Sequence, residues 1–441
     1  WSRVPGGPFG VSLFYTLSGY LITQLMISDH ARTGRTDLKH FWSRRLRRLA
    51  PGSIIVVLAV TVVALMGVFT GERLRGDLLA TVGYGANWRF ATAGTTYAQL
   101  FESTPSPLLH FWSLAIEEQF YVVFPLLMAV LLRWRRLMLP TLALLAALSA
   151  GAMVLTSSRN VAYYGTHTRA AEFLIGALLA LVVPMRKEIT QRMQAFFAVG
   201  GVIALGVYVY ISGTVNASDG WLYQGGLTGF TIISCLLIVA VLVPGPVRSL
   251  MSLRPLVELG KVSYSVYLFH WPVFVLLNEE RLGFDGLALS LIRLLVSLSL
   301  GLISARVIEN PIRLRRVLRG SRQASWAFVV SLILAVIAIA GISTASPSAL
   351  AGVDAPDEFV QFTLAPTTSV IEPQRAPLKI LVLGSEPLIE SDIRQAIGDE
   401  IPIEIVNGVL AGCPVRPLEI ASGECESLMA MAQRLLLRLQ G

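Results

Sequence analysis

Two adjacent carboxylates, Glu117 and Glu118, stand in the segment SLAIEEQFYVVFPLL, whose other residues suit a lipid bilayer. A charge inside a bilayer costs roughly 3 kcal/mol on insertion scales, so such residues usually face the interior of a helix bundle and mark function. His110 lies seven positions before Glu117, which is two helical turns and about 10 Å along one helix face. Because a histidine and a carboxylate at one site can supply a general base and its orienting group, we predict catalytic roles for these three residues.

The two glutamates point about 100° apart on a helix, so they cannot share one partner. One could face a cavity while the other pairs with an arginine from another segment, and Arg169 is a candidate. Arg169 could instead pair with Glu172, three positions further along its own apolar segment, as a salt bridge that fixes helix packing. Substrate binding or structural support is also the expected role of Trp112, Tyr264 and His270, which lie in apolar segments.

Four arginines gather in the stretch HFWSRRLRRLAP, from His40 to Pro51. One interpretation is that the cluster sets the membrane topology and contacts anionic lipid headgroups. This interpretation explains the charge without any ligand. Guanidinium groups also bind phosphates through paired hydrogen bonds, so the cluster could instead hold the phosphates of a molecule such as coenzyme A. The residues alone leave both interpretations open.

The elements that carry these residues are membrane spans. With 54% hydrophobic and 15% charged residues among 441, the composition is that of a membrane protein. The net charge of +8 comes from basic residues in short loops, as the positive-inside rule requires, so we expect no binding of nucleic acid. Runs of roughly 17–25 apolar residues predict about ten spans, near residues 9–28, 52–70, 109–132, 138–156, 170–184, 195–212, 227–243, 256–278, 286–308 and 325–345.

The arginine-rich loops orient the spans, because positively charged loops stay in the cytoplasm. The span near 52–70 leaves the cytoplasm and the span near 109–132 returns to it. We therefore expect the semi-apolar piece near 78–90 to be re-entrant, short or peripheral, and buried against protein. The same alternation starts the first span outside, implies one further span upstream, and places residues after about Ser346 on the outer face.

Composition divides the chain into three parts. Residues 1–345 predict an all-α polytopic membrane bundle, and residues 346–377, rich in Pro, Ala, Ser and Thr, predict a linker. Residues 378–441 contain a strand pattern, LKILVLG, a helical stretch, a second strand pattern, IPIEIVNG, and a terminal helix. This order predicts a small α/β domain outside the cytoplasm.

Six motifs follow each other in order from about Gly6: GGPFGVSLFYTLSGYLIT, FWSRRLRRLAP, HFWSLAIEEQFYVVFPLL, TRAAEFLIGALLA, VSYSVYLFHWPVF and ENPIR. In this order they resemble acyltransferase family 3, a family of integral membrane acyltransferases. They resemble in particular its members with an extracytoplasmic SGNH-like domain at the C-terminus. The resemblance implies that the third part of this chain, 378–441, is a partial or degenerate domain of that type.

The resemblance also implies an activity, namely transfer of an acyl group, usually acetyl from acetyl-CoA, to a hydroxyl of an envelope glycan or glycolipid. Arg44, Arg45 and Arg48 would then contact acyl-CoA from the cytoplasm. His110 and the two glutamates match the family's histidine and carboxylate pair. The resemblance implies no metal, and it implies a location in the bacterial inner membrane.

Three features depart from the family's pattern. The family's first span usually has an essential histidine preceded by an arginine, and this chain starts after that point. Ser12 stands where the family commonly carries aspartate. In the last part of the chain, Gly384 is followed by Ser385 and Glu386 instead of Asp-Ser, and residues 346–441 contain no histidine. We therefore expect no Ser–His esterase there.

The mechanism that we expect is O-acylation across the membrane. Coenzyme A docks at the cytoplasmic arginines, and a histidine with carboxylate help deprotonates the acceptor hydroxyl or carries the acyl group itself. A secondary transporter also combines many spans with intramembrane carboxylates and a broken helix, and substrate flux without coenzyme A would favour it. A non-catalytic scaffold for envelope enzymes is the third alternative, and it predicts no affinity for coenzyme A at the arginines.

Overall fold

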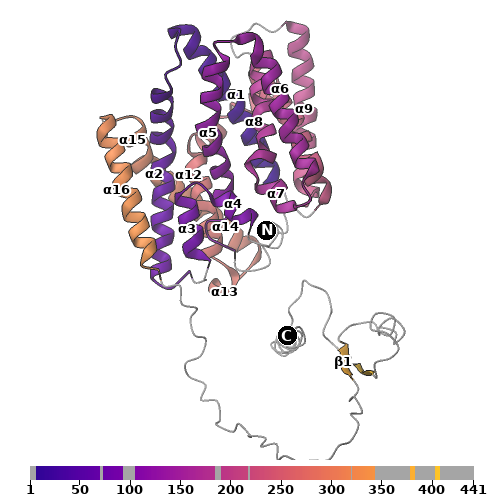
Figure 1. Cartoon of the computed structure of the whole chain (residues 1–441), viewed down its shortest axis with the longest axis vertical. Helices are drawn as coiled ribbons and strands as arrows, with labels where there is room; N and C mark the ends of the chain where they lie inside the picture. Colours follow the sequence, from indigo (N-terminus) through magenta and orange to yellow (C-terminus); the bar gives the residue numbers. More distant parts are fainter. Residues whose placement is uncertain are drawn as a thin grey trace, which may run out of the picture. The chain divides into compact units, whose positions relative to one another are not determined.

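The computed structural model describes residues 6–69, 73–92, 105–183, 190–216, 219–318, 320–342, 378–382 and 403–407. Internal contacts divide the chain into two units, Trp1–Gly352 and Val353–Gly441. The described part of the first unit is a helical bundle (Figure 1). Its helices and two π-helical turns are α1 (Gly7–Thr33), α2 (Leu38–Leu65), α3 (Leu74–Val82), α4 (Ala86–Ala91), α5 (Phe111–Leu131), α6 (Arg135–Leu155), α7 (Arg159–Tyr164), α8 (Thr166–Val182), α9 (Gln191–Thr214), η2 (Leu222–Gly226), α10 (Leu227–Leu242), α11 (Pro246–Met251), α12 (Arg254–Leu276), α13 (Glu279–Leu282), α14 (Gly286–Ser304), η3 (Ala305–Glu309), α15 (Asn310–Arg313) and α16 (Ser321–Ala340).

In the part of the chain that the structure describes, seven segments are long and apolar enough to cross a membrane: Gly7–Thr33, Leu38–Leu65, Phe111–Leu131, Arg135–Leu155, Gln191–Thr214, Leu222–Leu242 and Gly286–Arg313. Each overlaps a predicted span, and the chain is a multi-pass membrane protein. The other three predicted spans are helical too, but α8 has 17 residues, α12 begins with charged residues, and the apolar part of α16 is Phe328–Ala340. The count of ten therefore stays a prediction.

Glycines bring α1 and α8 close together in the bundle. A Cβ atom added at Gly19 would overlap the carbonyl oxygen of Phe173, and one added at Gly176 would overlap that of Thr16. Small residues allow this approach between membrane helices, where van der Waals packing drives association. The crossing also stacks Tyr15 on Phe173, with ring centroids 4.2 Å apart, and so fixes the residues of α1 that face α5.

Replacing Gly19 by alanine is expected to destabilise the bundle by about 3 kcal/mol or more. The added methyl group meets a backbone carbonyl of α8, which can move only with its helix. Gly200→Ala in α9 is the matched control, since a Cβ there meets no atom within 4 Å. Thermal unfolding of both variants in detergent checks this, and equal melting temperatures would contradict it.

The piece near 78–90, which we expected to be short or re-entrant, forms the two short helices α3 and α4. They have nine and six residues, too few to cross a bilayer, and they join at Tyr84, whose φ is 51°. Gln119 of α5 donates to the carbonyl oxygen of Tyr84 over 2.8 Å and to Asn87 over 3.0 Å. Leu78 and Asn87 are fully buried, so the pair is packed against α5.

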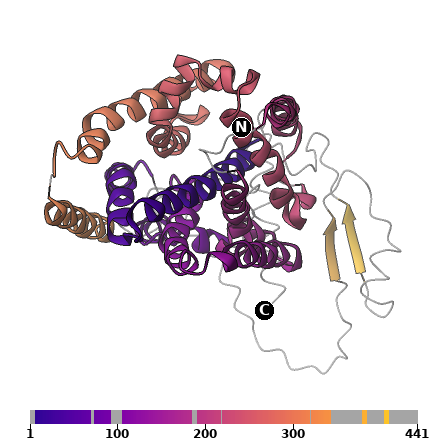
Figure 2. The same cartoon turned by 90° about the horizontal axis from the view of Figure 1, so that it is seen from above.

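The helices α12 and α14 pack on each other along one edge of the bundle, coloured salmon in Figure 2. Glu309, in the ENPIR motif, is buried there and accepts hydrogen bonds from Ser304 over 2.7 Å and Ser265 over 2.8 Å. A Cβ added at Gly52 of α2 would lie 3.2 Å from the Glu309 side chain. The motif thus holds α12, which carries Tyr264 and His270, between α14 and α2.

In the second unit the structure describes two strands, β1 (Leu378–Val382) and β2 (Ile403–Asn407), which pair in parallel. Both lie where the sequence predicts strands. Parallel strands need a crossover connection between them, and the predicted helices of this part lie outside the described residues, as does the predicted linker 346–377. The α/β domain and the predicted domain boundaries therefore stay predictions.

Candidate active site

One face of α5, together with its N-cap residue, carries four polar residues: His110, Ser113, Glu117 and Tyr121 follow each other at intervals of three, four and four positions. Residues at these spacings share one face of a helix. They form what we name the α5 polar face. All four are buried, and their partners come from α1, α2 and α12. The fold thus brings separate segments to one line of polar groups.

Glu117 is the buried charge in the middle of the α5 polar face, with 2% of its surface exposed. Ser18 of α1 donates a hydrogen bond to its Oε1 over 3.2 Å, and the hydroxyl of Tyr121 donates to the same oxygen. No ion pair involves Glu117 among the described residues. Hydroxyl donors therefore hold this carboxylate, and its charge is balanced from a longer distance.

The arginine-rich first part of α2 places positive charge near Glu117. The guanidinium of Arg45 lies 4.6 Å from the ring centroid of Tyr121. Arg45 and Arg48 both have a favourable electrostatic interaction with Glu117. The indole N–H of Trp42 donates to the carbonyl oxygen of Tyr121 over 2.9 Å and so joins α2 to α5. Two of the predicted phosphate-binding arginines thus lie at one end of the α5 polar face.

The other two arginines of the cluster have partners of their own. Arg44 forms an exposed ion pair with Asp29 of α1 at 3.1 Å. Arg47 is buried and donates to the carbonyl oxygens of Leu318 and Gly320 over 2.7 and 3.1 Å. Arg47 therefore anchors the segment before α16. A phosphate contact of Arg44, which stays a prediction, would have to compete with its pair with Asp29.

Glu118 lies on a neighbouring face of α5, as the 100° spacing predicts. It is partly exposed and lies within electrostatic range of Tyr84, between α3 and α4, and of Tyr264 in α12. The hydroxyl of Tyr264 lies 2.8 Å from that of Ser53 and 2.6 Å from the carbonyl oxygen of Leu49. Tyr264 thus fastens α12 to α2, which is a structural contact. The paired glutamates face different helices.

Two histidines meet at the other end of the α5 polar face. The rings of His110 and of His270, from α12, have their centroids 5.4 Å apart. Nε2 of His110 lies 3.0 Å from the carbonyl oxygen of Leu268, and Nδ1 of His270 contacts that of Tyr267. The hydroxyls of Tyr267 and Ser113 lie 2.6 Å apart, so α12 closes against α5 here. No spacing along the chain predicts that the two histidines are neighbours.

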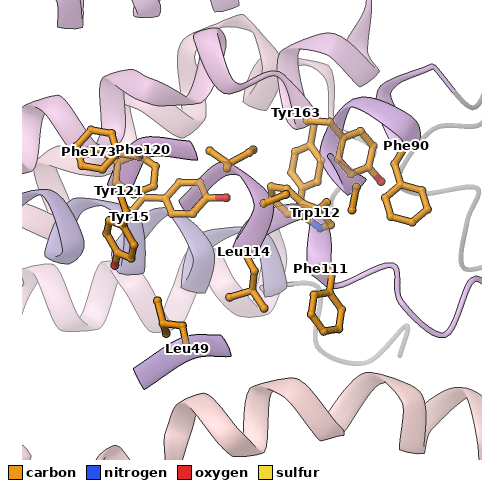
Figure 3. Packing of buried hydrophobic residues seen from close by; sticks show 14 of the residues in the cluster. Tyr15, Leu49, Phe90, Phe111, Trp112, Leu114, Phe120, Tyr121, Tyr163 and Phe173 are labelled. Atoms are coloured by element: carbon orange, nitrogen blue, oxygen red, sulfur yellow. The ribbon is translucent and has the colours of Figure 1, made fainter. Parts of the chain in front are cut away.

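Arg169 and Glu172 form a fully buried ion pair within α8, with Nε and Oε1 2.6 Å apart. This decides between the alternatives that the sequence left open: the partner of Arg169 is in its own helix and is neither of the paired glutamates. Ser12 accepts a hydrogen bond from Arg169 over 3.1 Å. Three rings lie 5.3 to 5.7 Å from the guanidinium, namely Tyr15, Trp112 and Tyr163. Figure 3 shows Trp112 beside Tyr163, so Trp112 belongs to the surroundings of this ion pair.

The sequence singled out His110 and Glu117 but not the other two members of the α5 polar face or the partners of these residues. Ser113 and Tyr121 stand four positions on either side of Glu117, and this helical spacing was a signal that could have found them. Ser18 and Tyr267 come from distant segments, and no local pattern relates them to α5. Figure 3 shows Tyr15 and Tyr121 among the side chains of the packed core.

The site can handle an anion at one end and a proton at the other. Its α5 polar face extends eleven positions, from Tyr121 beside Arg45 to His110 beside His270, which is about 16 Å of helix. Arg45 and Arg48 are the groups suited to the phosphates of an acyl-CoA. Within the described residues no three His, Cys, Asp or Glu side chains gather as a metal site would require.

This fold and site define a class: a multi-pass membrane protein with acid–base groups buried in its bundle and a basic edge beside them. The chain belongs to the Acyl_transf_3 family, whose model, described as an acyltransferase domain, matches residues 1–345. The membership predicted from the six motifs is thereby confirmed. The SGNH-like nature of the last part of the chain stays a prediction.

Two relatives show how far the similarity extends. The chain is 36% identical over 325 residues to the O-acetyltransferase OatA of Staphylococcus aureus, a match that covers 70% of this chain and 53% of that protein. It is 32% identical over 328 residues to the peptidoglycan O-acetyltransferase OatA of Listeria monocytogenes, covering 71% and 52%. The chain thus spans about half the length of these relatives. No solved structure matches it.

Proposed function

We propose that this chain is the membrane part of an O-acyltransferase in a bacterial inner membrane. It moves an acyl group, most simply acetyl, from cytoplasmic acyl-CoA to a hydroxyl of a glycan or glycolipid outside. The names of the relatives support this, since both are O-acetyltransferases and one is named for peptidoglycan. Because the chain spans about half their length, the whole activity is part of the proposal.

The observation that carries the proposal is the α5 polar face, a line of buried acid–base groups that begins beside arginines. Buried charges are costly in a membrane protein and usually mark function. Among the residues that the structure describes, Glu117 is held by hydroxyls and forms no ion pair. The buried pair of Arg169 and Glu172, in contrast, is fully matched within one helix and has the features of a structural element.

The donor end of the site lies at Arg45 and Arg48. Guanidinium groups recognise phosphate and stay charged in a membrane protein. Bound there by its phosphates, acyl-CoA can extend its long arm along α5, so that the thioester reaches the stretch between Glu117 and His110. The electrostatic interaction of both arginines with Glu117 supports the view that the two ends of the donor site act together.

The reaction needs a base on the α5 polar face. The base takes the proton of the acceptor hydroxyl, the oxygen attacks the thioester carbonyl carbon, and the carbon–sulfur bond breaks. The thiolate of coenzyme A leaves and takes up the proton. Help from a positioned base is typically worth about 10²–10⁴-fold. Glu117 supplies negative charge next to the reacting groups, and Glu118 supplies it from the partly exposed side.

The test measures acetyl-CoA hydrolysis and transfer to an added glycan by the purified chain in proteoliposomes. Arg48→Ala is expected to raise KM for acetyl-CoA about tenfold with little change in kcat, because a hydrogen bond to a charged group contributes about 1.5–3 kcal/mol. Glu118→Gln is expected to lower kcat. Arg136→Ala, at another exposed arginine, is the control for loss of charge. An unchanged KM for acetyl-CoA in Arg48→Ala together with an unchanged kcat in Glu118→Gln would remove the proposed site.

A further inference from the structure

The pairing of His110 with His270 fixes where each ring carries its proton. Nε2 of His110 faces the carbonyl oxygen of Leu268, and Nδ1 of His270 faces that of Tyr267. A carbonyl oxygen only accepts hydrogen bonds, so both of these nitrogens are N–H donors. In the neutral rings, Nδ1 of His110 and Nε2 of His270 therefore carry free lone pairs.

The lone pair of His110 is buried without a partner. The residue is 5% exposed, and its Nδ1 forms no hydrogen bond with the residues that the structure describes. Leaving a buried acceptor unsatisfied costs about 1–3 kcal/mol. Such groups are rare in native proteins and call for an explanation, of which a catalytic role is one. A ligand that donates a hydrogen bond would remove this cost.

Two lone pairs on neighbouring rings select the chemistry of that ligand. Each needs a hydrogen-bond donor. A sugar presents several through its hydroxyl groups, whereas the thioester group has none and the amide donors of coenzyme A lie on its arm, between the thioester and the phosphates. The histidines also lie at the end of the α5 polar face away from Arg45 and Arg48, about 16 Å along the helix. The anionic donor and the hydroxyl-bearing acceptor thus have separate places along one helix.

We propose that His110 and His270 form the binding site for the acceptor, a sugar that presents two neighbouring hydrogen-bond donors. This inference rests on the proposed function and assigns one half of its substrate site. Nδ1 of His110 takes the proton from the hydroxyl that is acylated. The new carbon–oxygen bond forms as the carbon–sulfur bond breaks, and the leaving thiolate recovers that proton from His110. Nε2 of His270 accepts from the second donor of the sugar and orients it.

Two conservative variants remove one lone pair each. His110→Gln keeps an N–H donor close to the position of Nε2, for Leu268, and loses Nδ1. His270→Asn keeps a donor close to the position of Nδ1, for Tyr267, and loses Nε2. His167→Gln, at an exposed histidine of α8, is the matched control.

The experiment measures, for each variant, the Kd for acetyl-CoA and the rate of transfer to an N-acetylglucosamine oligomer. His110→Gln is expected to lower transfer about 10²–10⁴-fold with the Kd unchanged. His270→Asn is expected to raise KM for the oligomer about tenfold or more, again with the Kd unchanged, and His167→Gln to change neither. Wild-type transfer in both variants overturns the inference, and so does a loss of acetyl-CoA binding, which would assign the histidines to the donor end or to folding. If the proposed function itself were wrong, the result would be different from these: the wild type would then neither bind acetyl-CoA nor transfer the acetyl group to the oligomer.

Discussion

Replacing Glu117 by glutamine is expected to lower kcat for acyl transfer at least about 100-fold. Glutamine has nearly the same shape and can still accept hydrogen bonds from Ser18 and Tyr121 through its amide oxygen, so the packing around position 117 is kept. The variant loses the charge and the basic oxygen, and such groups in direct contact with the reaction are worth about 10²–10⁴-fold. The measurement is kcat for transfer from acetyl-CoA, with folding checked by gel filtration.

A smaller effect would have a different physical meaning. A carboxylate that acts on the base only through space, from about 10 Å away, contributes about 1.7 kcal/mol at an effective dielectric constant of about 20. That corresponds to roughly a fifteenfold change in rate. A loss of this size or less would contradict a direct role for Glu117. The control is Glu258→Gln, the same change at an exposed residue that pairs with Lys261.

Replacing Glu172 by glutamine is expected to destabilise the folded chain by about 3–5 kcal/mol. Arg169 and Glu172 are both fully buried, and removing one partner leaves an uncompensated buried charge. The hydrogen bond of Arg169 to Ser12 and the surrounding rings do not replace the lost negative charge. Thermal unfolding in detergent measures the change.

A double variant separates the charge from the shape. Arg169→Met with Glu172→Leu removes both charges together, and it is expected to be less destabilising than Glu172→Gln alone, because an apolar replacement of a whole buried pair is often tolerated. The exposed control Glu258→Gln is expected to change stability by less than about 1 kcal/mol. If Glu172→Gln were as stable as this control, the ion pair would have no structural role.

The parts of the fold that follow from local pattern agree with the structure. Apolar runs predict helices because a chain in a membrane must satisfy its own backbone hydrogen bonds, and helices stand at all the predicted spans. Seven of the described segments are both long and apolar enough to cross a membrane. The shortness of α3 and α4 follows from the parity of the basic loops. The two strands β1 and β2 lie at the predicted β-patterns.

The partners of the predicted site residues did not follow from local pattern. Arg169 had two candidate partners at the sequence level, and packing of α8 assigned it to Glu172. Trp112, which stands next to the catalytic candidates in the sequence, turned out to face Arg169. The cluster of four arginines separated into Arg45 and Arg48 near Glu117 and two arginines with other partners.

The sequence by itself determined that this is a multi-pass membrane protein, that it belongs to its acyltransferase family, and that Glu117, Glu118 and His110 share one helix. These properties depend on composition, on motifs and on the period of the α-helix, all of which are local. Only the tertiary structure decided that His270 meets His110 and that Ser18 of α1 donates to Glu117. Side chains on different helices meet according to where the helices cross. The crossing is set by close contacts such as that of Gly19 in α1 with α8, and no spacing along the chain encodes these contacts.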